Sequence, residues 1–365
     1  MHLEVSEQSP ILIKSQQGDY PVDFISKPSS LTSLLPKSGE IFLLADRLVM
    51  DLYKEKLGSL VSFPTFLVDA NEETKTLEGV TRLIDWLLEK KATRSSHIIA
   101  LGGGVIQDLA TFTSHIYYRG IKWTFIPTTL LSQSDSCIGA KCGINVLPLK
   151  NQLGVLHSPA HVVICSDFLN TLPDVEIDSG YGEIYKLSLT GPEHFFDALA
   201  LIVASDGHRN PEILEVIRRS LLCKKLVIEE DEYELDSRRI LNYGHSFGHA
   251  LEALTKNEVP HGIAVMWGMD IINFLGVKWG ITNPELSKRI RNAMEKSTTF
   301  SIKNLPSAAA FVRMLARDKK VENGLMYFAV LHDSGDLRMH PKSLDGDLIH
   351  LVQKYLDDSP LFFTP

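Results

Sequence analysis

The sequence predicts an N-terminal α/β domain built on a parallel sheet, followed by a mainly α-helical C-terminal domain. Two observations predict this fold class. Short, uninterrupted apolar runs alternate with helix-like segments up to about residue 172, which is typical of a parallel sheet covered by helices. Beyond that point apolar residues recur at helical spacing instead. A chain of 365 residues has room for two domains, and we expect them at 1–172 and 173–365.

Five apolar segments predict the strands of the sheet in the N-terminal domain. They share a length of four or five residues and end close to a polar residue, glycine or proline: 41–45, 65–68, 97–101, 123–126 and 162–165. Between the second and the third, apolar residues recur at helical spacing and predict a helix over 73–91.

In the C-terminal domain, segments whose apolar residues recur at helical spacing predict helices. These are 211–230, 306–320 and 343–356, with a further helix that begins at Asn283-Pro284, an N-cap followed by a first-turn proline. Two short segments, 327–332 and 337–340, flank Asp333-Ser334-Gly335-Asp336 and predict a small hairpin.

Bulk composition limits the function. Hydrophobic residues make up 44% and charged residues 22%, as in ordinary globular proteins. The net charge of −8 argues against nucleic-acid binding, although local basic clusters can still bind an anionic substrate. The four cysteines form no C-x-x-C pair, and neither a signal peptide nor a membrane-spanning run is evident. We expect a cytoplasmic protein with no nucleic-acid or membrane partner.

A glycine-rich segment, Gly102-Gly103-Gly104, follows a predicted strand and precedes a predicted helix. Glycines there let a pyrophosphate approach the backbone, and a helix N-terminus favours its negative charge. Gln107 replaces the third glycine of G-x-G-x-x-G, so a plain tight turn explains the motif equally well. Thr128 and Thr129 end the next strand, where ligands bind in open α/β sheets, and favour a Rossmann-like nucleotide site.

Histidines form a second candidate site. His245 and His249 are four residues apart on one predicted helical face, and His261 follows. Upstream lie Glu183 and Lys186. Imidazole and carboxylate are the usual ligands of a catalytic zinc ion, and three protein ligands leave one position open. A lone histidine is more simply explained by helix packing, and Glu183 with Lys186 by a surface ion pair. Three histidines among glycines favour a metal site, in which His249 is either a ligand or an acid/base group.

Two lysines suggest anion-binding loops. Lys141 follows Gly139-Ala140, and Lys150 precedes Asn151. Other basic residues are individually compatible with surface charge.

Together these motifs resemble those of the sugar phosphate cyclases, and most of all the 3-dehydroquinate synthase family. The resemblance covers about residues 41–328. Its motifs occur in order as Gly-Gly-Gly-Val-Ile-x-Asp at 102–108, Arg119-Gly120, Pro127-Thr128-Thr129-Leu130-Leu131, Asp135-Ser136, Lys141, Lys150-Asn151, Glu183-x-x-Lys186, Asn242-x-Gly244-His245-x-x-Gly248-His249, His261-Gly262 and Asp318-Lys319-Lys320.

The resemblance implies a role for each matching residue. Zn²⁺, or Co²⁺, would be bound by Glu183, His245 and His261. NAD would be held by Asp46, Glu72, Lys75, Gly103, Gly104, Asp108, Thr128, Thr129 and Lys150. The substrate would face Asp135, Lys141, Asn151, Lys186, Lys224, Arg238, Asn242 and His249. Its phosphate would be held by Arg119 and Lys320, with Arg119 supplied by the neighbouring subunit of a homodimer.

The implied activity is that of an NAD- and metal-dependent phosphorus-oxygen lyase of the shikimate pathway, which leads to the aromatic amino acids. It would convert 3-deoxy-arabino-heptulosonate 7-phosphate to 3-dehydroquinate with elimination of phosphate. In such enzymes NAD takes up and returns one hydride, and the metal acts as a Lewis acid.

Three positions depart from the family pattern: Gln107, Ala140 and Ile263 stand where glycine, glycine and glutamate are common. Ile263 removes an expected partner of the metal ligands, which predicts weaker metal binding. Sister cyclases that act on sedoheptulose 7-phosphate are an alternative. Arg238 favours the carboxylated substrate instead, because a guanidinium pairs with a carboxylate through two parallel hydrogen bonds.

Two alternatives belong to other functional classes. A metal-dependent alcohol or glycerol-phosphate dehydrogenase would release NADH in every turnover. A binding or regulatory protein derived from a cyclase would not turn over at all, and the intact ligand set makes it the least favoured.

Overall fold

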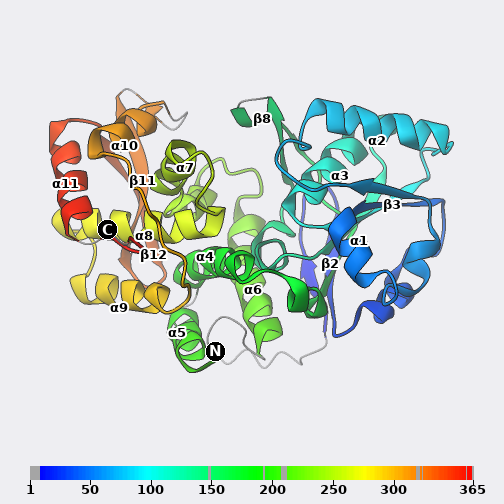
Figure 1. The fold of residues 1–365 in the computed structure, drawn as a ribbon, viewed down its shortest axis with the longest axis horizontal. Coiled ribbons are helices and arrows are strands. Elements are labelled where there is room, and N and C mark those ends of the chain that lie inside the picture. Colours follow the sequence, from blue (N-terminus) through cyan, green and yellow to red (C-terminus); the bar gives the residue numbers. More distant parts are fainter. Residues whose placement is uncertain are drawn as a thin grey trace. The chain divides into compact units, whose positions relative to one another are not determined.

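A computed structural model describes residues 9–146, 149–191, 194–206, 212–317, 321–322, 324–358 and 360–363. The chain divides into two compact units (Figure 1). Unit 1 comprises residues 1–172 and 225–233, and unit 2 comprises residues 173–224 and 234–365. Within the described residues, none of the helices combines the length and the apolar surface needed to cross a membrane.

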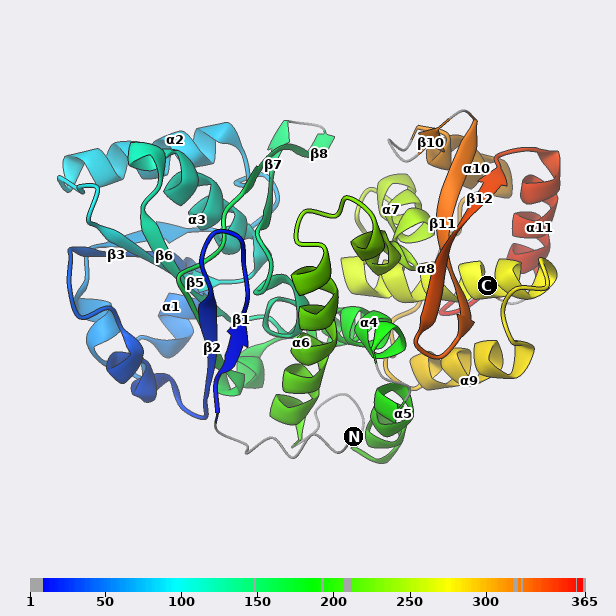
Figure 2. The same cartoon turned by 180° about the vertical axis from the view of Figure 1, so that it is seen from behind.

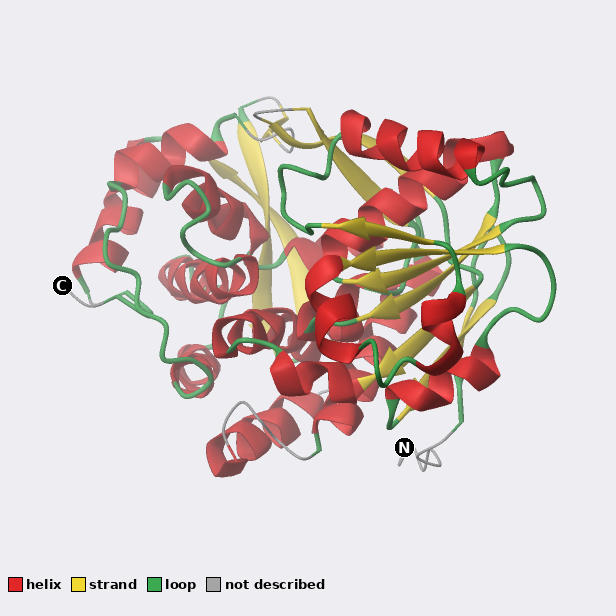
Figure 3. Ribbon diagram, turned by 45° about the vertical axis from the view of Figure 1, so that its right-hand side comes forward, coloured by secondary structure: helices red, strands yellow, loops and turns green. Residues whose placement is uncertain are grey.

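Unit 1 is built on a seven-stranded sheet. Its strands, in spatial order, are β1 (Ile11–Ile13), β2 (Tyr20–Ile25), β9 (His161–Cys165), β6 (Lys122–Pro127), β5 (His97–Gly102), β3 (Ile41–Asp46) and β4 (Thr65–Val68). β1 and β2 are antiparallel, whereas the pairs from β2 to β4 are parallel. Figure 3 shows the parallel arrows pointing the same way, so the carboxyl ends of β3, β5 and β6 lie at one edge.

The sequence predictions for this sheet are confirmed to within one residue at each predicted strand. β5 is buried at every position, which explains its uninterrupted apolar run. The antiparallel strands β1 and β2, and a separate hairpin of β7 (Lys141–Val146) and β8 (Leu149–Leu156), were not predicted.

Helices α1 (Arg47–Tyr53), α2 (Leu77–Glu89) and α3 (Gly104–Ile116) belong to unit 1. The predicted start of α2 at residue 73 is wrong. Thr76 caps the helix by accepting a hydrogen bond from the backbone N–H of Gly79, so the preceding residues form a turn.

Unit 2 is mainly helical, as predicted. Its helices are α4 (Asp174–Thr190), α5 (His194–Asp206), α6 (Ile213–Glu230, which continues into the unit 1 segment), α7 (His245–Leu254), α8 (His261–Lys278), α9 (Pro284–Glu295), α10 (Ala308–Leu315) and α11 (Gly346–Asp357). Asn283 caps α9 through its side chain, as predicted. The helices predicted over 306–320 and 343–356 are shorter or shifted, because Ser307 and Asp345 cap them later and residue 343 ends a strand.

A three-stranded sheet completes unit 2, with β10 (Val321–Glu322), β11 (Leu325–Asp333) and β12 (Asp336–Ser343). The predicted hairpin is confirmed, although each of its strands is longer than predicted. In Figure 1 and Figure 2, α7 and β11 lie beside α8, whose residues are buried along most of its length.

Candidate cofactor and metal sites

The three glycines of unit 1 differ in what surrounds them. A Cβ at Gly102 would lie 2.4 Å from Cγ1 of Ile106, and one at Gly103 would lie 3.0 Å from Cγ2 of Thr129. These two glycines therefore permit close packing where β5 meets α3. Gly104, the first residue of α3, is exposed, and an added Cβ would have no described heavy atom within 4 Å. This open space at a helix N-terminus suits a phosphate group.

Polar groups from neighbouring strand ends lie at the same sheet edge. Asp46 ends β3, caps α1 by accepting from the N–H of Leu48 at 3.0 Å, and has a pKa that burial raises. The N–H of Thr128 donates to the carbonyl of Gly102 at 3.0 Å, which fixes the end of β6 beside that of β5. A carboxylate, glycines and hydroxyls at adjacent strand ends are the groups that dinucleotide sites of open α/β sheets use.

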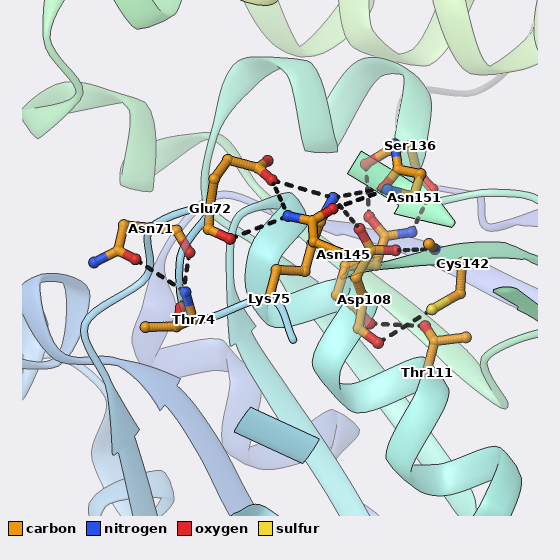
Figure 4. Close-up of polar contacts among 12 residues, drawn as sticks. Asn71, Glu72, Thr74, Lys75, Asp108, Thr111, Ser136, Cys142, Asn145 and Asn151 are labelled. Atoms are coloured by element: carbon orange, nitrogen blue, oxygen red, sulfur yellow. Dashed lines mark hydrogen bonds and ion pairs between the residues drawn. The ribbon is translucent and has the colours of Figure 1, made fainter. Parts of the chain in front are cut away.

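Lys75 lies at the centre of a polar network in unit 1 (Figure 4). Its Nζ donates to Oδ1 of Asn151 at 2.9 Å and lies 3.1 Å from Oδ2 of Asp108 and 3.6 Å from Oε2 of Glu72. Burial lowers the pKa of Lys75, but the two carboxylates outweigh it, so the ammonium is retained. The network thus places the ammonium of Lys75 beside polar atoms of three other predicted binding residues, Glu72, Asp108 and Asn151.

Asn145 is a member of this network that the sequence analysis missed. Its side chain donates to Oε2 of Glu72 at 2.8 Å and accepts from the N–H of Asn151 at 2.9 Å. Nothing in its sequence context signals this role, because the contacts depend on the pairing of β7 with β8. Asn151 itself has a positive φ of 52°, a conformation that asparagine tolerates better than most residues.

Gln107, which replaces a family glycine, does not cover the helix N-terminus. Its buried amide instead exchanges two hydrogen bonds of 2.6 Å with Ser136, one from each residue. Ala140 is buried at 1% exposure. Both departures are therefore accommodated within unit 1.

The remaining predicted residues of unit 1 are scattered among its loops. Asp135 is buried in the short π-helix Ser132–Ser136, whereas Lys141 and Lys150 are exposed on the hairpin. Arg119 is exposed and follows Tyr118 in a pair of left-handed residues, with φ of 63° and 50°. Such backbone conformations carry strain that surrounding structure must compensate.

In unit 2 the three predicted metal ligands lie together. Oε1 of Glu183 is 3.0 Å from Nε2 of His261 and 3.3 Å from Nε2 of His245. Ligands of a tetrahedral zinc ion, each at about 2.1 Å, lie about 3.4 Å apart, so these three atoms can bind one cation. One ring nitrogen of His249 also lies within 4.8 Å of a ring nitrogen of each of the other two histidines.

Each ligand imidazole is held from its far side. Nδ1 of His245 contacts the carbonyl oxygen of Tyr243 at 3.1 Å, and Nδ1 of His261 contacts Oε2 of Glu252 at 3.1 Å. Partners on Nδ1 leave Nε2 facing the metal position, the arrangement found around protein-bound metals. Glu252 was not predicted from the sequence. Ile263 is fully buried and its apolar side chain offers no such partner, so weaker metal binding stays a prediction.

Glycines bring the ligand-bearing helices into backbone contact. A Cβ at Gly182 would lie 2.1 Å from the carbonyl oxygen of Gly262, and one at Gly262 would lie 1.7 Å from that of Ser179. These contacts join α4 to α8 beside Glu183 and His261. Gly268 similarly approaches Gly244, since its Cβ would lie 1.9 Å from that carbonyl oxygen, and this contact joins α8 to α7.

Burial and neighbouring charges shift the pKa values of all three predicted metal ligands. Burial raises the pKa of Glu183, but Lys186, whose Nζ contacts Oε2, and His245 hold it well below its usual range. Burial lowers the pKa of His245. It also lowers that of His261, but hydrogen bonds to Glu183 and Glu252 raise it to about 10. In the absence of metal the cluster retains a carboxylate and an imidazolium, and a divalent cation would replace the proton.

Other predicted residues of unit 2 lie on neighbouring elements. Lys224 in α6 and Arg238 in the turn Ser237–Asn242 are buried. Asn242 donates to Oε1 of Glu234 at 2.6 Å. His249 is exposed, and its ring lies against those of His245 and His261. Lys320 lies outside the described residues.

Comparison with known proteins identifies two matching family models. The model described as 3-dehydroquinate synthase N-terminal matches residues 65–179, and the one described as 3-dehydroquinate synthase C-terminal matches residues 180–321. A 3-dehydroquinate synthase of Dictyoglomus thermophilum is 37% identical over 314 residues, which cover 86% of this chain and 88% of that protein.

Two solved structures share the fold. A 2-epi-5-epi-valiolone synthase from Streptomyces hygroscopicus, with NAD⁺ and Zn²⁺ bound, has a TM-score of 0.83 at 24% identity, over 95% of this chain and 99% of that one. A 2-deoxy-scyllo-inosose synthase, complexed with carbaglucose-6-phosphate, NAD⁺ and Co²⁺, has a TM-score of 0.82 at 21% identity, over 96% and 100%. At these identities the likeness concerns the fold.

Proposed function

Because this chain belongs to the 3-dehydroquinate synthase family, we propose that it converts 3-deoxy-arabino-heptulosonate 7-phosphate to 3-dehydroquinate and releases phosphate. The reaction is NAD- and metal-dependent and belongs to the shikimate pathway. The convergence of Glu183, His245 and His261 on one point carries this proposal, because it supplies the ligand set of a catalytic metal within unit 2.

The metal is Zn²⁺ or Co²⁺, held by Glu183, His245 and His261. Such a cation, when bound, polarises a coordinated hydroxyl or carbonyl oxygen. The protein's part is to hold the three donor atoms in place and to balance the charge. Lys186 contacts Glu183 and so keeps that carboxylate ionised and ready to coordinate. His249, exposed beside the cluster, is suited to exchange protons with substrate.

NAD is held by unit 1. The open space at Gly104 receives the pyrophosphate, the carboxylate of Asp46 accepts hydrogen bonds from a ribose, and Gly103, Thr128 and Thr129 line the same sheet edge. Lys75 is fixed by Asp108 and Glu72 and presents its charge beside Asn151. Lys150 completes the predicted cofactor set.

The family resemblance assigns substrate-binding roles to Asp135, Lys141 and Asn151 of unit 1 and to Lys186, Lys224, Arg238 and Asn242 of unit 2. Arg238 is buried, and its planar guanidinium is suited to pair with the substrate carboxylate through two parallel hydrogen bonds. Arg119 and Lys320 bind the phosphate. We further propose that the protein is a cytoplasmic homodimer in which Arg119 acts across subunits.

A phosphate-release assay tests the reaction. Metal-loaded protein with a trace of NAD is incubated with 3-deoxy-arabino-heptulosonate 7-phosphate, while inorganic phosphate and NADH absorbance are recorded. We expect phosphate in large excess over NAD and no net NADH, because the cofactor regains its oxidised form in each turnover. Glu183→Gln should abolish release, and Glu258→Gln, a change at an exposed glutamate of the same unit, should not.

The other outcomes identify the competing functions. NADH formed in proportion to substrate would replace the proposal with a dehydrogenase. Phosphate released from sedoheptulose 7-phosphate, but not from the carboxylated sugar, would replace it with a sister cyclase. Arg238→Lys keeps the charge but loses the planar fork, so it should raise KM for the carboxylated substrate more than it lowers kcat.

A further inference from the structure

Glu252 lies near the end of α7 and contacts the metal ligand His261, which begins α8. Its Oε2 is 3.1 Å from Nδ1 of His261, and Nε2 of the same ring is 3.0 Å from Oε1 of Glu183. We propose that Glu252 is the positioning residue that aims His261 at the divalent cation and sets its strength as a ligand. The inference rests on the proposed function, because it concerns the same metal site.

The contact determines which ring nitrogen is available. A carboxylate only accepts hydrogen bonds, so Nδ1 of His261 must carry a proton when Glu252 is ionised. The lone pair of the neutral ring then lies on Nε2, the atom that faces Glu183. The side chain of His261 is 34% exposed, whereas that of Glu252 is 11% exposed. Two buried carboxylates hold this one-third-exposed ring, Glu183 at Nε2 and Glu252 at Nδ1, and Glu252 is the one whose contact does not occupy the nitrogen that faces the metal position.

The backbone fixes Glu252 itself. Its carbonyl oxygen accepts from the N–H of Asn257 at 2.8 Å and lies 3.4 Å from the hydroxyl of Thr255, which closes the end of α7. Because α7 also carries His245 at its first residue, Glu252 connects the two histidine-bearing helices across the turn between them. The position of Glu252, and with it the orientation of the His261 ring, therefore depends on the distance between α7 and α8.

The two ligand histidines are held by different chemistry. His245 contacts a neutral backbone carbonyl, that of Tyr243, whereas His261 contacts a carboxylate. A carboxylate makes the imidazole a stronger donor to a cation than a carbonyl does. Glu252 thus supplies a carboxylate partner to a metal ligand in a chain where Ile263 replaces the glutamate common in the family.

Metal titration tests the inference without an activity measurement. The parent, Glu252→Ala, Glu252→Gln and the exposed-site control Glu258→Gln are titrated with Zn²⁺ against a competing chelator. A parallel titration with Co²⁺ follows its visible absorption, which reports ligand geometry. Glu252→Ala should weaken binding about 10- to 100-fold and shift the Co²⁺ bands. Glu252→Gln keeps an acceptor of the same shape and should lose less, and Glu258→Gln should match the parent.

Parental affinity and an unchanged Co²⁺ spectrum in both Glu252 variants would overturn the inference. Thermal unfolding of each metal-free variant identifies any folding defect, and if Glu252→Ala does not fold, the isosteric Glu252→Gln decides. A parent that binds neither metal would overturn this inference together with the metal part of the proposed function. A parent that binds metal more tightly than the Glu252 variants but releases no phosphate would support the inference and contradict the proposed reaction.

Discussion

Different interactions hold the residues of the two candidate sites in position. In unit 1, polar side chains from a turn, from helix α3 and from the β7–β8 hairpin are positioned by hydrogen bonds and ion pairs around Lys75. In unit 2, the ligands stand on helices whose backbones touch at glycines. Exposure differs as well, since the side chain of Glu183 is 3% exposed and that of Glu72 is 49% exposed. A rigid, buried site gives exact ligand spacing but tolerates change poorly, whereas a partly solvated network can adjust.

Removing the lysine from each site gives the largest expected contrast. Lys186→Met leaves the buried carboxylate of Glu183 without its ammonium partner and should lower the free energy of unfolding of the metal-free protein by about 3–5 kcal/mol. Lys75→Met should cost less, about 2 kcal/mol, because Glu72 is half exposed and Asp108 still accepts a hydrogen bond from the N–H of Gly143. Urea denaturation measures both.

Saturating Zn²⁺ sharpens this contrast. The cation should restore most of the stability lost in Lys186→Met, because it neutralises the same carboxylate, and should leave Lys75→Met unchanged. Equal losses for the two variants, or an equal response to Zn²⁺, would contradict the difference drawn between the sites.

Gly262→Ala tests the backbone contact that brings α4 and α8 together. The new methyl group would lie 1.7 Å from the carbonyl oxygen of Ser179, so the helices must separate. We expect a loss of about 3 kcal/mol in the free energy of unfolding, with weaker metal binding. The matched control is Gly346→Ala, where an added Cβ meets no described atom within 4 Å. If Gly262→Ala behaved like this control, helix contact would not set the ligand spacing.

The same difference explains how much could be predicted from the sequence. Strands such as β5 are short apolar runs, so burial on both faces revealed them directly. Helix α8 gave no such signal, because it is buried nearly all round and its apolar residues show no helical periodicity. The hairpin β7–β8 was missed because β7 shows no regular alternation of exposed and buried residues, and residues 150–156 of β8 are all exposed or partly exposed.

Within the sites, residue types were predictable but contacts were not. Spacing placed His245 and His249 on one helical face, and residue chemistry made His261 and Glu183 candidates as well, while the family resemblance assigned Glu183, His245 and His261 as the ligands. Their approach depends on glycine contacts between helices distant in sequence. Glu252 was missed for the same reason, since its contact with His261 forms only through the turn that joins α7 to α8.

His97 gives unit 1 a predicted sensitivity to acid. The ring is buried in β5, where Nε2 contacts the hydroxyl of Thr124 at 2.8 Å, and burial lowers its pKa to about 4. Between about pH 6.5 and 4 the unfolded chain binds a proton that the folded chain does not. This stability is therefore complete above pH 6.5 and falls with pH, by about 2 kcal/mol at pH 5.

Urea denaturation at pH 7 and pH 5 checks this effect. His97→Gln keeps a group that can hydrogen-bond to Thr124 but does not titrate, so its loss between the two pH values should be smaller by that amount. An identical pH dependence in parent and variant would show that His97 does not carry the acid sensitivity of the sheet.

Gly104→Ala carries the smallest expected change in energy and separates binding from stability in unit 1. Alanine at the first residue of α3 should leave the free energy of unfolding unchanged or raise it by up to about 1 kcal/mol, since the helix gains a better helix former. The added methyl group would enter the open space assigned to the pyrophosphate and should weaken NAD binding about tenfold, or about 1.4 kcal/mol. Calorimetric NAD titration measures this loss.

Gly102→Ala is the control for stability: its Cβ would collide with the side chain of Ile106, so this variant should destabilise the fold instead. Undiminished NAD affinity in Gly104→Ala would mean that the pyrophosphate does not approach α3, because a glycine with free space around it needs no structural explanation and only a ligand can make its missing side chain matter.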